Sequence, residues 1–149
     1  MIKIEHLSAG YGKHMILNDL TLTIPDHSIT AVIGPNGSGK STLFKSFFQL
    51  ADITSGEMYL NKESISSMRP KQLAQKMCYL SQHHSLPSIT VERLILHGRF
   101  PHLVYPRSYT NEDYEICEKS MAQAGILPLR NKNVSALSGG EQQKVFLAM

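Results

Sequence analysis

Two short segments of this 149-residue chain carry residue types suited to binding phosphate groups. The first reads Gly-Pro-Asn-Gly-Ser-Gly-Lys-Ser-Thr at residues 34–42. Glycines let several backbone N–H groups approach one anion, because no Cβ blocks the approach. At this spacing Lys40 is expected to reach the β and γ phosphates of a nucleotide, and the Ser41 hydroxyl to hold Mg²⁺. The predicted nucleotide-binding residues of this loop are Gly34, Pro35, Asn36, Gly37, Ser38, Gly39, Lys40, Ser41 and Thr42.

A phosphate-binding loop of this kind needs a strand before it and a helix after it. Residues 28–33 are apolar and rich in β-branched side chains, which predicts a buried parallel strand. Apolar residues at helical spacing predict a helix beginning near Lys40; they are Leu43, Phe44, Phe47 and Phe48. The alternative is a glycine-rich surface turn with an incidental lysine. The flanking pattern favours the nucleotide site.

The second segment reads Leu-Ser-Gly-Gly-Glu-Gln at residues 137–142 and opens a predicted helix. Ser138 and the N–H groups of Gly139 and Gly140 would form a second anion site at a helix N-terminus. The simpler reading is a serine N-cap followed by a flexible glycine pair. A single triphosphate does not need two such sites in one chain. Two chains arranged head to tail would use both, because the second segment of one then covers the γ-phosphate held by the other.

Composition gives no support for a nucleic-acid-binding, secreted or membrane-spanning protein. Fifteen Lys and Arg against twelve Asp and Glu give a net charge of +3, too small to argue for a nucleic-acid partner. Cys78 and Cys117 are far apart, which predicts two free buried thiols in a reducing compartment. No secretory signal is visible, and no apolar run approaches the roughly 20 residues that span a bilayer. We therefore expect a cytoplasmic chain that meets the membrane only through a partner.

The remaining pattern alternates strands and helices. Expected strands cover 2–7, 20–24, 57–60 and 77–81. Expected helices cover 70–76, 91–97 and 110–124. The last of these helices is expected to begin at a capping box and to end before Gly125. We expect a nucleotide-binding core over about 1–82, a helical subdomain over about 83–135, and the second motif with the start of its helix over 136–149.

In this order the motifs resemble those of ATP-binding subunits of ABC transporters. Residues 34–42 match the Walker A motif, and 137–142 match the signature motif, including Glu141 and Gln142. The resemblance implies an α/β P-loop NTPase fold with a RecA-like core and an inserted helical subdomain. It also implies ATP and Mg²⁺ as cofactors. Tyr11 then matches an aromatic that stacks on adenine, and Gln82 a glutamine that contacts Mg²⁺.

A narrower resemblance is to the ATPases of metal-chelate importers. It rests on three segments, 90–92, 97–102 and 146–149. It implies ATP-driven uptake of a chelate such as a ferric siderophore, haem or cobalamin. Implied partners are a second ATP-binding subunit in a homodimer, transmembrane permease subunits and, indirectly, a periplasmic or lipoprotein substrate-binding protein. The subunit would lie at the cytoplasmic face of the membrane. The pair His83–His84 lacks ligand spacing, so we expect no direct metal site there.

The chain departs from the family after the signature helix. An apolar strand ending in Asp-Glu, followed by a switch histidine, is expected there, and residues 1–149 contain neither. We therefore expect a C-terminally incomplete ATP-binding domain. Two alternatives stay open, a non-hydrolysing nucleotide-binding module and a soluble ABC ATPase outside transport. Long coiled-coil insertions or tandem cassettes would mark the latter, and neither is present here.

The missing acids predict that the polypeptide of residues 1–149 hydrolyses ATP negligibly. Without a base for the attacking water and full support for Mg²⁺, phosphoryl transfer loses most of its positioning and charge stabilisation. Phosphate release by the purified polypeptide should not exceed that of its Lys40→Ala variant. Steady turnover that disappears in Lys40→Ala would contradict the prediction.

Overall fold

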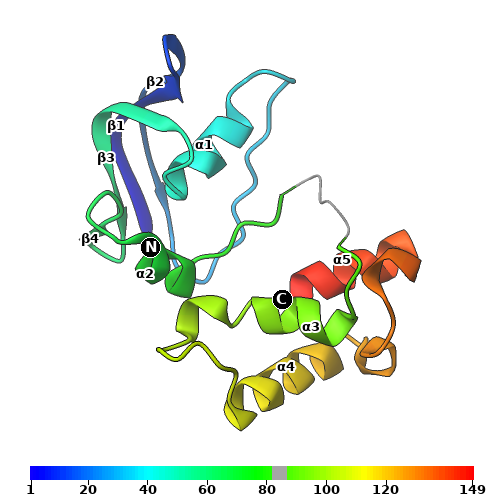
Figure 1. Ribbon diagram of the computed structural model, residues 1–149. Coiled ribbons are helices and arrows are strands. Elements are labelled where there is room, and N and C mark those ends of the chain that lie inside the picture. Colours follow the sequence, from blue (N-terminus) through cyan, green and yellow to red (C-terminus); the bar gives the residue numbers. More distant parts are fainter. Residues whose placement is uncertain (82–86) are drawn as a thin grey trace. The chain divides into compact units, whose positions relative to one another are not determined.

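A computed structural model describes residues 1–81 and 87–149 of the chain. The chain forms two compact units, Met1–Tyr79 and Leu80–Met149 (Figure 1). Each unit has its own hydrophobic core.

An antiparallel sheet of four strands forms the framework of the first unit. The strands are β1 (Ile2–Tyr11), β2 (His14–Ile24), β3 (Asp52–Leu60) and β4 (Glu63–Ser64), in the spatial order β2-β1-β3-β4. Ile4 of β1 lies between Leu22 of β2 and Met58 of β3, which sets the register across the three long strands.

Helix α1 (Lys40–Phe47) packs on this sheet (Figure 1). Its Leu43 and Phe47 are 5% and 3% exposed and join Ile4 and Met58 in one core. Helix α2 (Pro70–Lys76) adds Leu73 to the same core. The apolar spacing that predicted α1 is thus the face that the helix buries.

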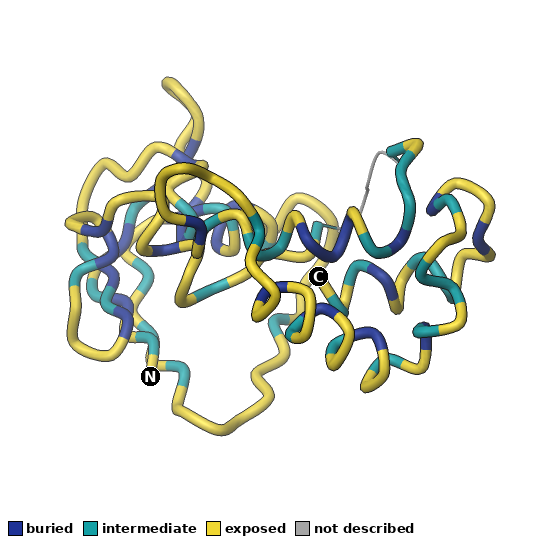
Figure 2. Tube along the Cα trace, turned by 60° about the horizontal axis from the view of Figure 1, so that its bottom comes forward, coloured by how far each residue is buried: buried dark blue, intermediate teal, exposed yellow. Residues whose placement is uncertain are grey.

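The described elements of the second unit are helices, with one isolated antiparallel bridge between Thr90 and Asn133. The helices are α3 (Val91–His97), α4 (Asn111–Gln123) and α5 (Gly139–Ala148), joined by the 3-10 turns η1 (Phe100–His102), η2 (Leu127–Leu129) and η3 (Val134–Ala136). The three α-helices contact one another in pairs. Their shared core is dark blue in Figure 2 and includes Val91, Ile95, Cys117, Met121 and Val145. In the part of the chain that the structure describes, no helix has both the length and the apolar character needed to cross a membrane.

Several local predictions are confirmed. Helices α2 and α3 have the predicted bounds, and α4 begins at a capping box in which Thr110 and Asp113 bond reciprocally. Gly125 follows α4 with a left-handed φ of 67°. The strand predicted over 57–60 is the second half of the longer β3.

Two predicted strands are wrong. Residues 28–33 are irregular, with Ile29 fully exposed and Ile33 92% exposed, and residues 77–81 are irregular as well. A strand needs a neighbour for its N–H and C=O groups, and the described residues pair neither segment with another strand. The burial predicted for Cys78 also fails, because its segment is exposed, whereas Cys117 is buried as predicted.

An ion pair ties α4 to the segment after α3. Arg99 Nε lies 2.9 Å from Asp113 Oδ1, and this carboxyl group also accepts hydrogen bonds from the backbone N–H and hydroxyl of Thr110. The Thr110 N–H, and next the Arg99 guanidinium, lower the pKa of Asp113 to about 2. One carboxylate thus caps α4 and fixes the preceding loop.

This lowered pKa predicts an acid-sensitive contribution to stability. Because the folded-state pKa lies below the unfolded value of about 3.9, the contribution is complete above that value and is lost as the pH falls toward about 2. Asp113→Asn should therefore lower the melting temperature at pH 7. The difference from the wild type should shrink between about pH 4 and pH 2. Glu112→Gln is the matched control, since Glu112 is an exposed acid in the same helical turn. Equal losses in the two variants, or a difference independent of pH, would contradict this role.

Candidate nucleotide-binding site

The predicted phosphate-binding loop forms a tight turn that leads directly into α1. The N–H of Ser38 donates to the carbonyl of Pro35 over 3.3 Å, which closes the turn. Gly37 and Gly39 have φ values of 83° and 90°, in the left-handed region that favours glycine. Residues 34–38 are exposed, as in a surface turn, and the loop continues into a helix that buries one face.

Lys40 places its charge inside the loop. Its Nζ donates to the carbonyls of Gly34 and Pro35, both over 2.7 Å, and lies 3.4 Å from the Ser38 hydroxyl. The ammonium group is therefore held against the loop backbone. An ammonium held this way is a point charge available to a phosphate entering the loop.

The first turn of α1 offers the other features that an anion site needs. Gly39 is the N-cap of the helix and, as a glycine, has no side chain that could accept hydrogen bonds from the first N–H groups of the helix. Ser41 is exposed in this turn, whereas Thr42 is 5% exposed and faces the core. The helix dipole adds partial positive charge at the same end. Of the two hydroxyls, Ser41 is the one placed to meet a ligand.

Tyr11 lies in the same unit, at the end of β1. Its ring lies near α1, where Lys45 Nζ is 5.6 Å from the ring centroid. The next residue, Gly12, donates its N–H to the Asp52 carboxylate over 2.8 Å. Sequence reasoning had no signal for this role of Asp52, which anchors the turn to the start of β3. Gln82 lies outside the described residues.

The second motif opens α5, in the other unit. Ser138 is the N-cap, and its hydroxyl and N–H donate to Glu141 Oε2 over 2.6 and 2.8 Å. The hydroxyl bond, and next the N–H bond, lower the pKa of Glu141. Gln142 turns back and donates to the carbonyl of Leu137 over 2.9 Å. Glu141 and Gln142 therefore stabilise the start of α5 by hydrogen bonds to Ser138 and Leu137.

Gly139 and Gly140 leave the start of α5 open. Both are exposed, and a Cβ added to either would meet no atom within 4 Å. Among the described residues, no acceptor bonds to their N–H groups. This end of α5 therefore combines free backbone donors with room for a ligand.

Comparison with known proteins decides the family. Residues 17–149 match the family described as ABC transporter. The chain belongs to the ABC transporter family. Its α/β fold, predicted from the two motifs, is the fold of that family's ATP-binding domains.

Curated relatives of this ABC chain include two iron-uptake proteins. It is 39% identical over 146 residues to the ferric enterobactin transport ATP-binding protein FepC of Escherichia coli, which covers 97% of this chain and 54% of FepC. It is 38% identical over 149 residues to the iron(3+)-hydroxamate import ATP-binding protein FhuC of Bacillus subtilis, which covers 99% of this chain and 55% of FhuC. The chain thus spans about half the length of the curated relatives it matches.

Solved structures share the fold of this ABC chain. The ADP conformation of MJ1267, an ATP-binding cassette of an ABC transporter, has a TM-score of 0.83 at 22% identity and covers 99% of this chain and 63% of that one. A nucleotide-free ATP-binding cassette from an ABC transporter has a TM-score of 0.84 at 21% identity, with the same coverage. At these identities the likeness concerns the fold alone.

The segment that resembled metal-chelate importers has a structural role in this ABC chain. A Cβ at Gly98 would lie 1.9 Å from the backbone oxygen of Met149, so the C-terminal end of α5 packs closely against this glycine. Arg99 forms the ion pair with Asp113 described above. Among residues 1–81 and 87–149, no three His, Cys, Asp or Glu side chains gather as a metal site would require. The pair His83–His84 lies outside the described residues.

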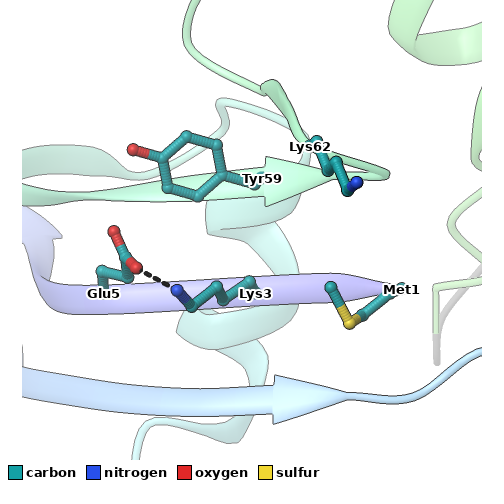
Figure 3. Close-up of a pocket in the computed structure, with 5 residues that line it drawn as sticks. All are labelled: Met1, Lys3, Glu5, Tyr59 and Lys62. Atoms are coloured by element: carbon teal, nitrogen blue, oxygen red, sulfur yellow. Dashed lines mark ion pairs between the residues drawn. The ribbon is translucent and has the colours of Figure 1, made fainter.

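A depression lies on the sheet of the first unit (Figure 3). Lys3 and Glu5 of β1 form an ion pair there, beside Tyr59 of β3. Met1 and Lys62 complete the lining. Because the charges of Lys3 and Glu5 engage each other, we assign no ligand to this depression.

The loop geometry predicts a difference between two glycine substitutions. Gly37→Ala should cost about 1–2 kcal/mol, because its left-handed φ is strained for alanine although nothing lies within 4 Å of the new Cβ. Gly39→Ala should cost more, because its Cβ would also lie 2.9 Å from the buried Leu17. Denaturant unfolding of both variants measures the difference. Equal stability losses would contradict the observed packing of the loop on β2.

Proposed function

We propose that this chain is part of an ATP-binding subunit that energises an ABC importer, and that the importer takes up a metal chelate such as a ferric siderophore. The observation that carries the proposal is the loop at the start of α1, with the Lys40 ammonium held among its carbonyls. Family membership and the transport functions that FepC and FhuC are named for support the importer assignment.

Each motif has a role in this proposal. The loop residues 34–42 bind the phosphates, with Lys40 on the β and γ phosphates, and Tyr11 stacks on adenine. Ser41 is a ligand for Mg²⁺, which fits its exposed hydroxyl, and Gln82 contributes to the same ion. When bound, Mg²⁺ neutralises charge on the phosphates. The domain limits proposed are those predicted above, a core over about 1–82, a helical subdomain over about 83–135 and the signature segment over 136–149.

The signature residues act on a second copy of the subunit. Gly139 and Gly140 offer two free N–H groups to the γ-phosphate held by the partner's loop. The Ser138 hydroxyl would join them by exchanging its bond to Glu141 for one to the phosphate. Glu141 and Gln142 fix the helix start that presents these donors. A homodimer would thus bind two ATP molecules. Permease subunits, with a periplasmic or lipoprotein substrate-binding protein, would complete the importer at the cytoplasmic face of the membrane.

The proposed dimer predicts that ATP-dependent pairing is lost when the start of α5 is blocked. In the full-length protein, Gly140→Arg should abolish ATP-dependent pairing, because the bulky side chain fills the open start of α5 while the Ser138 cap stays intact. Ser138→Arg should also abolish pairing, with some loss of stability from the broken cap. Sedimentation with and without ATP measures both.

The matched control is Ala122→Arg, which adds the same side chain at an exposed position of α4 and should leave pairing unchanged. Pairing that survives in both α5 variants would contradict the dimer role.

The importer assignment needs its own test. Cells that lack the full-length protein should lose uptake of a ⁵⁵Fe-labelled siderophore and regain it on complementation, and unchanged uptake of every ferric chelate tested would contradict that assignment.

A further inference from the structure

Helix α1 carries a second lysine that bears on the nucleotide site. Lys45, in the last turn of α1, is half-buried, and its Nζ lies 5.6 Å from the centroid of the Tyr11 ring. A lysine ammonium within about 6 Å of a ring centroid is attracted by the ring's quadrupole. The two residues are far apart in the sequence, so the fold has brought this cation to this ring.

The backbone and the ring of Tyr11 are held by different elements. The sheet holds the backbone, since Tyr11 pairs with His14 and the neighbouring Gly12 N–H bonds to Asp52. The ring itself is 38% exposed. Among the described residues, Lys45 is the cation that lies over this ring. The ammonium is therefore placed to favour one orientation of the ring.

We propose that Lys45 is a positioning residue of the base subsite, where its ammonium orients the Tyr11 ring as the platform on which the purine of the bound nucleotide stacks. The inference rests on the proposed function, because it takes Tyr11 as the adenine-stacking residue. It adds that one helix, α1, sets the distance between the phosphate subsite and the base subsite. Lys40 at the start of α1 holds the loop and Lys45 holds the ring, about 7.5 Å further along the helix axis.

A different role for Lys45 makes a different prediction. If its charge simply attracted phosphates, removing it would weaken every polyphosphate ligand alike. If it orients the ring, removing it weakens only ligands that carry a base. Inorganic tripolyphosphate has the phosphates of ATP without the base, so a comparison of the two ligands separates these roles.

The test is calorimetric titration of the full-length protein with Mg·ATP and with Mg·tripolyphosphate. Lys45→Met removes the charge and keeps the unbranched stem. We expect it to weaken ATP binding about two- to fivefold, the range of an exposed cation–π contact, and to leave tripolyphosphate binding unchanged. Lys45→Arg should restore ATP binding, because a guanidinium also binds an aromatic face. In a Tyr11→Ala background, Lys45→Met should have no further effect.

Lys13→Met is the matched control, since it removes one positive charge from the turn that follows Tyr11 without a recorded ring contact. The inference is overturned if Lys45→Met binds ATP as the wild type does, or if it weakens both ligands equally. It is also overturned if the effect persists in the Tyr11→Ala background. Failure of the proposed function would look different, because wild-type protein would then bind neither ligand, or would bind ATP equally well after Lys40→Ala.

Discussion

The candidate site depends on the burial of one face of α1 against the antiparallel sheet. Leu43 and Phe47 place the helix in the core of the first unit, and the helix start then fixes the loop that holds Lys40. A multiply charged phosphate needs donors that are already in place, because reorganising a flexible loop around it would reduce the binding free energy. Apolar packing on one side of α1 thus prepares an anion site at its end.

In the second unit, hydrogen bonds at the helix ends fix the positions where the helices begin. Asp113 caps α4, and Glu141 with Ser138 caps α5, so that each short helix begins at a defined residue. In α5 the cap occupies the serine and the glutamate, while the two glycine N–H groups between them stay free. An ABC signature motif can therefore be both a stable helix start and an open anion site.

Local signals in the sequence predicted local features well. The bounds of α2 and α3 and the cap of α4 follow from side chains within a few residues of each helix end. The strands predicted over 28–33 and 77–81 were wrong because an apolar run indicates burial but does not supply the neighbouring strand. Contacts between distant residues were also out of reach. Neither the Lys45–Tyr11 contact nor the bond from Gly12 to Asp52 leaves a pattern in a single sequence.

In the proposed dimer, ATP binds at the loop of one copy and is covered by the signature motif of the other. Hydrogen–deuterium exchange of the full-length protein, with and without Mg·ATP, tests this arrangement most directly, because bound phosphates should protect the N–H groups that contact them. We expect slower exchange in peptides covering 34–42 and 138–142, with the second effect appearing only at concentrations where the protein pairs. Unchanged exchange over 34–42 at saturating ATP would contradict it.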